Sequence, residues 1–489
     1  MSSKFNENID KRVEKFIEYL DRTNMDHKEY QIEGVRWCLV NELRPCPIEN
    51  VRGGFIADEM GLGKTIMVIG VMLTNFKPKT LIVLPPVLIN QWFMQILRTT
   101  GHKALVYHGG KKKKITIEEL NKACIVLTSY GSLVPNIKQK VKSNTTLLHD
   151  INWSRIVYDE AHHLRNKNTA VYNSVERLNC DICWLVSGTP VQNKKADFYN
   201  LCSILKIPKS FYKNEENIVT IARNFILKRT KKQVGVNLSD INSTNNLVDW
   251  KNKKEMEFSE EIHSSLRFSK VQSKGNNPDC PMILLMLRAK QSCVMPKLME
   301  EGLKKLVRDG VISDYDYFKE AINYNSKIDF VIKTILSRKD NDKGKIVFCH
   351  YRDEIDEIAE RLHCGGIERI ATIDGRVSNN RRNKIIKGKY DVLILQIQTG
   401  CEGLNLQENY SEIYFVSPHW NPAVEDQAIA RCHRIGQKNI VSVFKFQMSG
   451  FVSNQIDENG NKIDTLTIEK YANNVQDSKR EMANNIIDN

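Results

Sequence analysis

A phosphate-binding loop is the first feature of the sequence that could carry chemistry. The segment GGFIADEMGLGKT (residues 53–65) ends as such loops end, but Asp58 stands where the spacing G-x-x-x-x-G-K-[ST] would place the first glycine. The segment lies between two apolar runs, so we expect a strand-to-helix turn whose N–H groups and helix dipole can hold phosphates. A helix start with a chance pattern is the alternative. The residues expected to bind phosphate and Mg²⁺ are Gly61, Gly63, Lys64 and Thr65.

A pair of carboxylates follows in RIVYDEAHHL. Asp159 and Glu160 stand at the end of an apolar run that is typical of a buried strand. Adjacent carboxylates can divide the work of hydrolysis, with Asp159 holding Mg²⁺ and Glu160 orienting and deprotonating the attacking water. A solvated Asp-Glu turn is the alternative, and the phosphate loop upstream disfavours it.

A basic segment near the C-terminus, NPAVEDQAIARCHRIGQ (421–437), predicts a helix. Asn421 can cap its start and Gly436 can end it. Three residues spaced i, i+4 and i+7 would then share one face: Gln427, Arg431 and Arg434. Two arginines presented together are typical of arginine fingers, which stabilise the charge that develops on a γ-phosphate. A solvated basic helix is the alternative.

These candidate residues need strands to position them, and short apolar runs supply two sets. The runs are bounded by turn residues and separated by stretches long enough for helices, which is typical of buried parallel strands. The first set is 80–85, 124–130, 155–160 and 183–190, and the second is 345–351, 391–396, 412–418 and 439–446. The sequence therefore predicts an α/β protein with two units in series.

The segment between the two sets is polar and rich in Asn, Lys and Ser, and then becomes apolar and helical in PMILLMLRAKQSC. We interpret it as a helical insertion, and the tail as a polar helix or frayed end. The predicted organisation is an N-terminal helical extension (1–27), a first unit (28–235), the insertion (236–325), a second unit (326–455) and the tail (456–489).

Composition narrows the class of partner. The 489 residues carry a formal net charge of +14, so a polyanion is the natural partner. No apolar stretch approaches the ~20 residues that span a bilayer, and the N-terminus lacks the apolar core of a secretion signal. Two basic runs, KKKK (111–114) and KRTKK (228–232), could contact phosphates or act as a nuclear import signal, with solvated loops as the alternative.

The motifs taken in order resemble a known family. YQIEGVRW, DEMGLGKT, TLIVLPPVLINQW, DEAHHLRN, SGTPVQN, LRAKQSC, TGCEGLNLQ and NPAVEDQAIARCHRIGQ are similar to the motif set of the Swi/Snf-type ATPases of helicase superfamily two, over residues 28–450. That family has D-E-x-G-x-G-K-T at the phosphate loop, so Asp58 fits its pattern. The resemblance implies two RecA-like lobes in tandem, with ATP as fuel and Mg²⁺ as cofactor.

The resemblance also implies roles for individual residues. Gln31 would read adenine, and Arg431 and Arg434 would be the arginine fingers. Ser187, Thr189 and Gln437 would sense the nucleotide and couple it to DNA. The loop from Gly400 to Asn405 resembles one that lies beside both the γ-phosphate and the DNA backbone, although Cys401 and Glu402 stand where relatives have small residues.

The function expected from this resemblance is ATP-dependent translocation on double-stranded DNA by a monomer that remodels or displaces bound proteins of chromatin, transcription or repair complexes. The closest branch contains transcription-termination and postreplication-repair ATPases. We expect a nucleus or a viral replication compartment, and the Lys/Asn/Ile-rich composition is compatible with a large DNA virus. The alternatives are a strand-separating DEAH-type RNA or DNA helicase and a nucleic-acid scaffold with an inactive nucleotide site.

Overall fold

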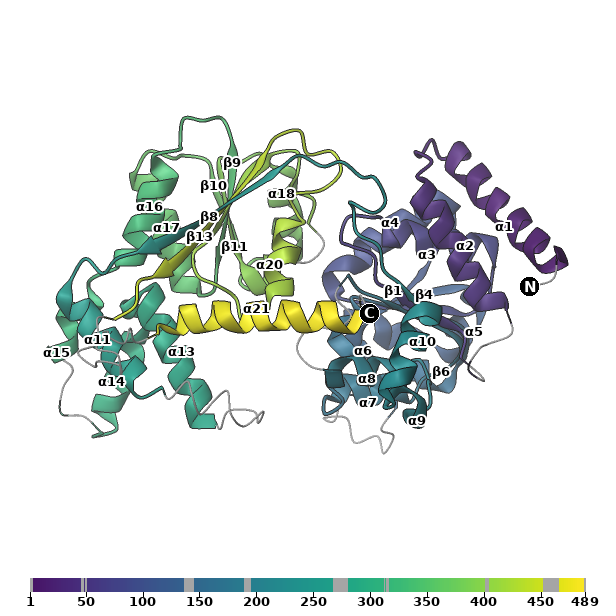
Figure 1. Cartoon of the computed structure of the whole chain (residues 1–489), viewed down its shortest axis with the longest axis horizontal. Coiled ribbons are helices and arrows are strands. Elements are labelled where there is room, and N and C mark those ends of the chain that lie inside the picture. The colour runs from purple at the N-terminus through teal and green to yellow at the C-terminus, as the bar shows by residue number, and fades with distance from the viewer. Residues whose placement is uncertain are drawn as a thin grey trace. The chain divides into compact units, whose positions relative to one another are not determined.

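The computed structural model divides the chain into two compact units (Figure 1). It describes residues 3–44, 48, 51–135, 145–188, 195–266, 280–311, 313, 316–400, 404–451 and 466–487. The first unit comprises Met1–Asn237 with Glu481–Asn489, and the second comprises Leu238–Arg480. The five segments predicted from the sequence remain predictions, but the proposed N-terminal extension and insertion lie within these two units. Among the described helices, none combines the length and apolarity of a membrane-spanning segment.

The first unit is built on a parallel sheet with the strand order β3-β4-β2-β5-β6-β1-β7. Its strands are β1 (Gly53–Ile56), β2 (Thr80–Leu84), β3 (Leu105–Tyr107), β4 (Ile125–Ser129), β5 (Asn152–Asp159), β6 (Asn179–Val186) and β7 (Ile226–Leu227). All four apolar runs of the first set are confirmed as strands. The strands β3 and β7 were not predicted, because three and two residues are too few to show a pattern.

Helices cover both faces of this sheet, so its central strands are buried on both sides. Along β2, Leu81 and Val83 belong to one apolar core, whereas Ile82 and Leu84 belong to the other. The helices are α1 (Ser3–Arg22), α2 (Glu29–Leu43), α3 (Lys64–Thr74), α4 (Ile89–Thr100), α5 (Ile117–Lys122), α6 (Tyr130–Leu133), α7 (Ala170–Glu176), α8 (Lys195–Ile204), α9 (Lys209–Tyr212) and α10 (Glu215–Phe225).

The second unit has its own parallel sheet with the order β10-β11-β9-β12-β13-β8. Its strands are β8 (Ile241–Val248), β9 (Gly344–Cys349), β10 (Ile370–Ile373), β11 (Val392–Gln396), β12 (Tyr410–Phe415) and β13 (Val441–Met448). All four runs of the second set are confirmed. Strand β8 was not predicted: it lies in the segment 236–325, which we interpreted from the sequence as a helical insertion with a polar first part. It is an edge strand of mostly exposed polar residues, so it lacks the apolar alternation that reveals strands.

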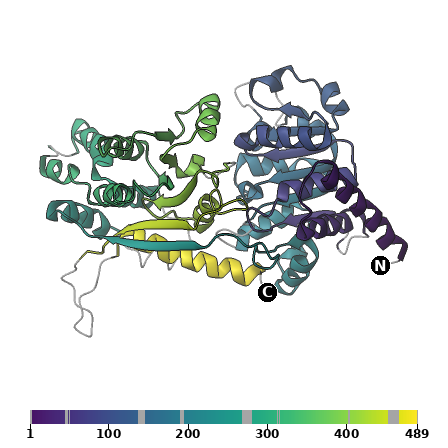
Figure 2. The same ribbon diagram turned by 90° about the horizontal axis from the view of Figure 1, so that it is seen from above.

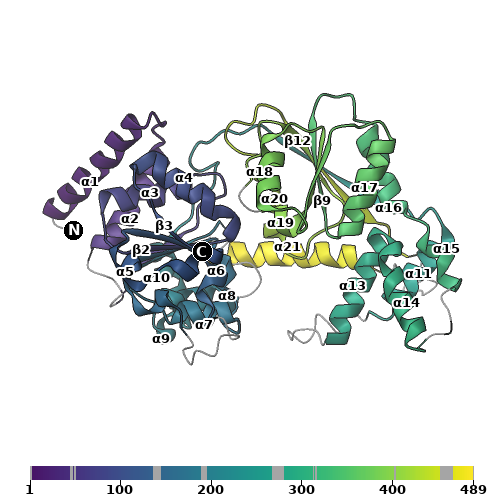
Figure 3. The same cartoon turned by 180° about the vertical axis from the view of Figure 1, so that it is seen from behind.

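The helices of the second unit also form two groups (Figure 3). Residues of α16, α17 and α21 pack in one core, and residues of α18, α19 and α20 pack in the other. The helices are α11 (Lys253–Ser264), α13 (Cys280–Val294), α14 (Glu300–Arg308), α15 (Asp316–Ile322), α16 (Ser326–Leu336), α17 (Arg352–Cys364), α18 (Asn379–Lys387), α19 (Ile397–Gly400), α20 (Pro422–Ile429) and α21 (Ile468–Ile487).

The tail is a packed helix, α21, and not a frayed end. Ile468, Tyr471 and Ala472 are buried in the core of the second unit. Figure 2 shows α21 running beside β13 and β8, and residues of all three elements line one cavity. The helix was predicted correctly, but its polar composition hid the narrow apolar face that holds it.

Candidate functional site

The phosphate loop joins β1 to α3, as its position between two apolar runs predicted. Gly63 is the residue before the helix and has φ +81°, and Gly61 has φ +95°, so both adopt the left-handed backbone that favours glycine. A Cβ atom at Gly63 would lie 2.3 Å from Nε2 of Gln31, whose amide donates to the carbonyl of Leu62 at 3.0 Å. Gln31 of α2 is therefore packed directly against the loop, next to the expected phosphate site.

Asp58, which replaces the first glycine, anchors the loop. Its carboxylate is fully buried and accepts two hydrogen bonds from Arg229, from Nε at 3.1 Å and from Nη2 at 2.5 Å. Arg229 also donates to the carbonyl of Tyr30 at 2.6 Å, and Lys231 pairs with Glu59 at 3.0 Å. Arg229 and Lys231 of the KRTKK run therefore neutralise the loop's own acids, and a role of the run in phosphate contact or nuclear import stays a prediction.

We expect Arg229→Met to destabilise the first unit by about 3–5 kcal/mol, because it leaves the Asp58 carboxylate buried without a partner. Lys231→Met is the matched control, since its partner Glu59 is well exposed and the pair should contribute less than about 1 kcal/mol. Chemical denaturation of both variants measures the difference. Equal losses of stability would show that the Asp58–Arg229 pair is not the anchor of the loop.

Lys64 is the first residue of α3, and its ammonium lies over the loop. Nζ donates to the carbonyl of Asp58 at 2.8 Å. A Cβ atom at Gly188 would lie 3.4 Å from the same nitrogen, so the start of the SGTP motif is next to Lys64. Thr65 follows in the first turn of α3. Ser187 is buried at the end of β6, whereas Thr189 lies outside the described residues.

The two carboxylates lie at the end of β5, as predicted. The indole N–H of Trp92 donates to Oδ2 of Asp159 at 2.7 Å, and the backbone N–H of Glu160 donates to Oδ1 at 3.0 Å. Burial raises the pKa of Asp159 to about 7, the negative charge of Glu160 adds to the rise, and the Trp92 bond and the charge of Lys64 oppose it. Lys64 and Asp159 are thus close enough to interact, and a divalent cation held by Asp159 and Thr65 would relieve the buried charge.

Glu160 has an unusual backbone. Its φ is +51°, a left-handed value that costs energy for any residue with a Cβ and is enriched at functional sites. Its carboxylate lies 3.3 Å from Nδ1 of His162 and is partly exposed. Asp159 is thus buried while the Glu160 carboxylate is partly exposed, which suits a division between metal binding and water activation.

The two arginines lie together in the second unit, but not on the helix that the sequence predicted. Helix α20 ends at Ile429, and turns with shorter-range hydrogen bonds carry Arg431 and Arg434. The prediction of a helix that continues to a stop at Gly436 is therefore wrong, although Asn421 does cap α20, accepting from the N–H of Ala423. Three backbone bonds, from His433, Cys432 and Arg431 back to residues 428 and 429, tighten the chain after the helix.

Among the residues that the structure describes, these arginines have no neutralising partner. Burial and the charge of Arg431 lower the pKa of Arg434, which donates to Oδ1 of Asn405. Nε of Arg431 is buried, and it has no hydrogen-bond acceptor within the part of the chain that the structure describes. Across those same residues no carboxylate pairs with either guanidinium. Two close, unpaired cations favour an anion as their ligand.

For the remaining predicted residues, the structure shows local contacts that do not test the predicted roles. Gln437 donates from Nε2 to the carbonyl of Tyr410 at 2.9 Å and accepts from the N–H of Asn439 at 2.9 Å, so its amide is engaged within the second unit. Gln427 of α20 is buried. Of the Gly400–Asn405 loop, residues 401–403, with Cys401 and Glu402, lie outside the described residues. The roles of all these residues stay predictions.

Sequence reasoning missed Trp92 and Arg229, which hold Asp159 and Asp58 in place. Both stand in motifs that the sequence displays, LINQW and LKRTKK. A signal for Arg229 existed, because an aspartate in a tight loop beside a strand must be neutralised if it is buried. No pattern in the sequence indicated which cation would do so.

Comparison with known proteins agrees with the fold. Two parallel sheets in a mixed α/β chain match the tandem RecA-like lobes of helicase superfamily two cores. The helicase domain of Pyrococcus furiosus Hef superposes over 87% of this chain and 96% of its own with a TM-score of 0.51, at 17% identity. The likeness is one of fold: two RecA-like lobes in tandem.

Family models then identify the chain. A model described as the SNF2-related domain matches residues 30–298, more than half of the chain, and a helicase conserved C-terminal domain matches residues 326–436. The chain therefore belongs to the SNF2-related family of helicase superfamily two ATPases.

Two relatives illustrate the match. A protein of Mycoplasma genitalium described as an uncharacterized ATP-dependent helicase is 27% identical over 87% of this chain and 40% of its own length. A probable global transactivator of Orgyia pseudotsugata multicapsid polyhedrosis virus is 26% identical over 96% of this chain and 92% of its own length. The chain thus spans less than half of the first relative and nearly all of the second.

Proposed function

We propose that this protein is a DNA-dependent ATPase that moves along double-stranded DNA and remodels or displaces DNA-bound proteins. The observation that carries the proposal is that Lys64 lies over the phosphate loop, where Nζ donates to the carbonyl of Asp58 at 2.8 Å, while its charge lowers the pKa of Asp159, the residue that precedes Glu160 at the end of β5. A nucleotide's phosphates and a Mg²⁺ ion supply the charges that these residues need. The net charge of +14 supports a polyanionic partner.

Each residue then has a role. Gln31 recognises adenine, Lys64 binds the β- and γ-phosphates, and Thr65 and Asp159 hold Mg²⁺. Glu160 orients and deprotonates water. Arg431 and Arg434 belong to the other compact unit, and they stabilise the γ-phosphate only when the two units come together. This dependence would couple hydrolysis to movement on DNA.

The protein partners and the location follow from the same proposal. A motor that grips phosphates without reading bases acts on any duplex, and its targets are proteins bound there, such as polymerases, repair complexes or nucleosomes. The viral relative supports a nuclear or viral replication compartment.

We expect ATP turnover to rise with duplex DNA and much less with single-stranded DNA or RNA. Binding to duplex DNA should be independent of sequence and should weaken by about 0.9 log units per log unit of salt for each neutralised phosphate. In the presence of ATP, the protein should displace the third strand of a DNA triplex while a duplex with a single-stranded tail stays paired. Gel assays of both substrates measure these outcomes, with Glu160→Gln as the inactive control.

The second candidate is a strand-separating helicase, which the DEAH sequence favours. Efficient unwinding of the tailed duplex without triplex displacement would support it and overturn the translocase. If RNA alone stimulated ATP turnover, the substrate would be RNA and not DNA.

A further inference from the structure

The loop that joins β12 to α20 is held by its backbone from two distant segments of the chain. Three consecutive carbonyls accept hydrogen bonds from side chains: Pro418 from Nζ of Lys290 at 2.8 Å, His419 from Nε2 of Gln476, and Trp420 from Nζ of Lys479 at 2.9 Å. Lys290 lies in α13, and the other two donors lie in α21. The helical insertion and the tail helix therefore meet at this one loop, which we call the 418–420 loop.

Burying the ammonium of Lys290 costs desolvation free energy, which is large for a single hydrogen bond to a carbonyl. The side chain is 6% exposed, and burial lowers its pKa to about 8, although nearby carboxylates, including Glu469 and Glu354, counter that fall. Its second contact is with His350, at 3.2 Å. An apolar side chain would fill this position at lower cost. A lysine at this buried position is consistent with a role in fixing the position of the 418–420 loop, in addition to filling space.

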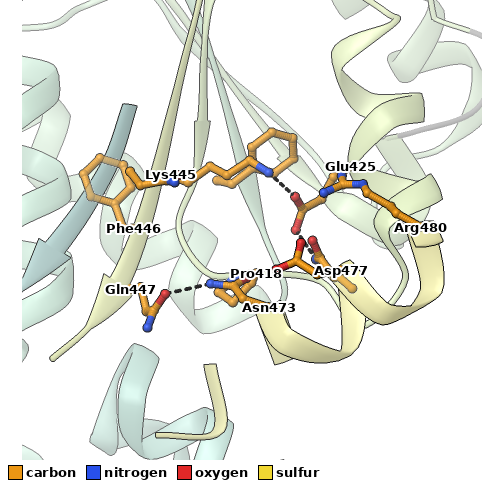
Figure 4. A pocket seen from close by; sticks show the side chains of 11 residues that line it. Pro418, Glu425, Lys445, Phe446, Gln447, Asn473, Asp477 and Arg480 are labelled. Atoms are coloured by element: carbon orange, nitrogen blue, oxygen red, sulfur yellow. Dashed lines mark hydrogen bonds and ion pairs between the residues drawn. The ribbon is translucent and has the colours of Figure 1, made fainter. Parts of the chain in front are cut away.

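The tail helix also fixes α20 itself (Figure 4). Glu425, which is 1% exposed, accepts from Gln476 at 2.8 Å, from Lys445 of β13 at 2.7 Å and from the backbone N–H of His419 at 2.8 Å. Arg480 pairs with Asp426 at 3.2 Å. These groups surround a cavity of about 200 Å³ between α20, β13 and α21. Polar contacts thus restrain both the 418–420 loop and the helix α20 that follows it.

Only one residue separates the end of α20 at Ile429 from Arg431. We propose that Lys290, Gln476 and Lys479 are positioning residues, which act through the 418–420 loop and α20 to place Arg431 and Arg434 for catalysis. This inference rests on the proposed function, because it assumes that the two arginines act on ATP. It assigns a role to the LRAKQSC motif of the insertion and to the tail helix, neither of which the nucleotide site explains.

The test compares Lys290→Met and Lys479→Met with Ser478→Ala in the full chain. Ser478 is an exposed neighbour whose side chain donates to the carbonyl of Asn474 in its own helix at 3.1 Å. Each Met variant should lower kcat by about 10- to 100-fold with little change in KM for ATP, because small misplacement of a catalytic group costs this much. Hydrogen exchange of the amides in 418–434 should also quicken, whereas Ser478→Ala should change neither quantity.

The Arg434→Ala variant distinguishes failure of the positioning inference from failure of the proposed function. If it loses kcat while both Met variants keep the wild-type kcat and exchange rates, the positioning inference is overturned and the proposed function stands. If Arg434→Ala keeps the wild-type kcat, the arginine role falls, and this inference falls with it. Should Lys290→Met fail to fold, the partly exposed Lys479 carries the test alone, with the same two readouts.

Discussion

Lys64→Ala and Glu160→Gln should each abolish ATP turnover, but only Glu160→Gln should keep tight ATP binding. Lys64 is the cation of the phosphate loop, and in its absence the loop has only backbone N–H groups and the α3 dipole for the phosphates. Glu160→Gln keeps Lys64, Thr65 and Asp159, so the phosphates and Mg²⁺ still have their ligands. It removes only the base, whose loss costs roughly 10²–10⁴-fold in rate.

The measurement is turnover with saturating duplex DNA, beside equilibrium binding of a fluorescent ATP analogue. Lys231→Met is a suitable control, because it removes a cation of the same unit that pairs with Glu59 of the loop. It should keep both turnover and binding. Substantial turnover by Glu160→Gln would remove that residue from the role of general base, and tight ATP binding by Lys64→Ala would remove Lys64 from the phosphate site.

The strands that could be predicted from the sequence are those buried on both faces of a sheet. Strands such as β2 and β11 are buried on both faces, so they appear as continuous apolar runs bounded by turns. Strand β8 shows the limit of this reasoning. It pairs with β13 over eight residues, from Ile241 to Val248, yet nearly all of its side chains face solvent. Its position is fixed by backbone hydrogen bonds, which leave no pattern in the side chains.

In the candidate site, too, some positions were predicted correctly from the sequence and others were not. Motif spacing predicted Lys64 in a strand-to-helix turn and Asp159 and Glu160 at the end of a strand. The structure has Lys64 at the start of α3 and Asp159 at the end of β5, and the charge of Lys64 lowers the pKa of Asp159. Helical periodicity gave the wrong geometry for Arg431 and Arg434, because capping signals at Asn421 and Gly436 do not show where the hydrogen-bond ladder stops. Gly436 does have a positive φ of +96°, but it ends a series of turns and not a helix.

Long-range partners were the least predictable part. The Trp92 bond to Asp159 joins residues 67 positions apart, and the Arg229 pair with Asp58 joins residues 171 positions apart. Such contacts depend on the complete packing of the first unit. Local sequence could indicate that a buried carboxylate needs a donor, but it could not choose among the many donors available.

Arg431→Ala and Arg434→Ala should each lower kcat by roughly 10³-fold or more, with little change in ATP binding, because the residues proposed to hold the adenine, the phosphates and Mg²⁺ belong to the first unit. Arg→Lys should not restore the rate at either position, since an ammonium lacks the planar fork that contacts two phosphate oxygens. Steady-state hydrolysis with saturating ATP and duplex DNA measures kcat, and the fluorescent analogue measures binding.

The structure also predicts what these variants do to stability, which separates catalysis from folding. The two guanidiniums repel one another: the charge of Arg431 helps to lower the pKa of Arg434, and across the described chain no carboxylate neutralises either. Removing one cation relieves that repulsion and loses the bond from Arg434 to Asn405, so the net change in unfolding free energy should stay within about 1 kcal/mol. A large loss of kcat with an unchanged denaturation midpoint therefore identifies a charge kept for the reaction. Wild-type turnover by Arg434→Ala would mean that the γ-phosphate is stabilised by other cations, and that the unpaired arginines have a different anion as their ligand.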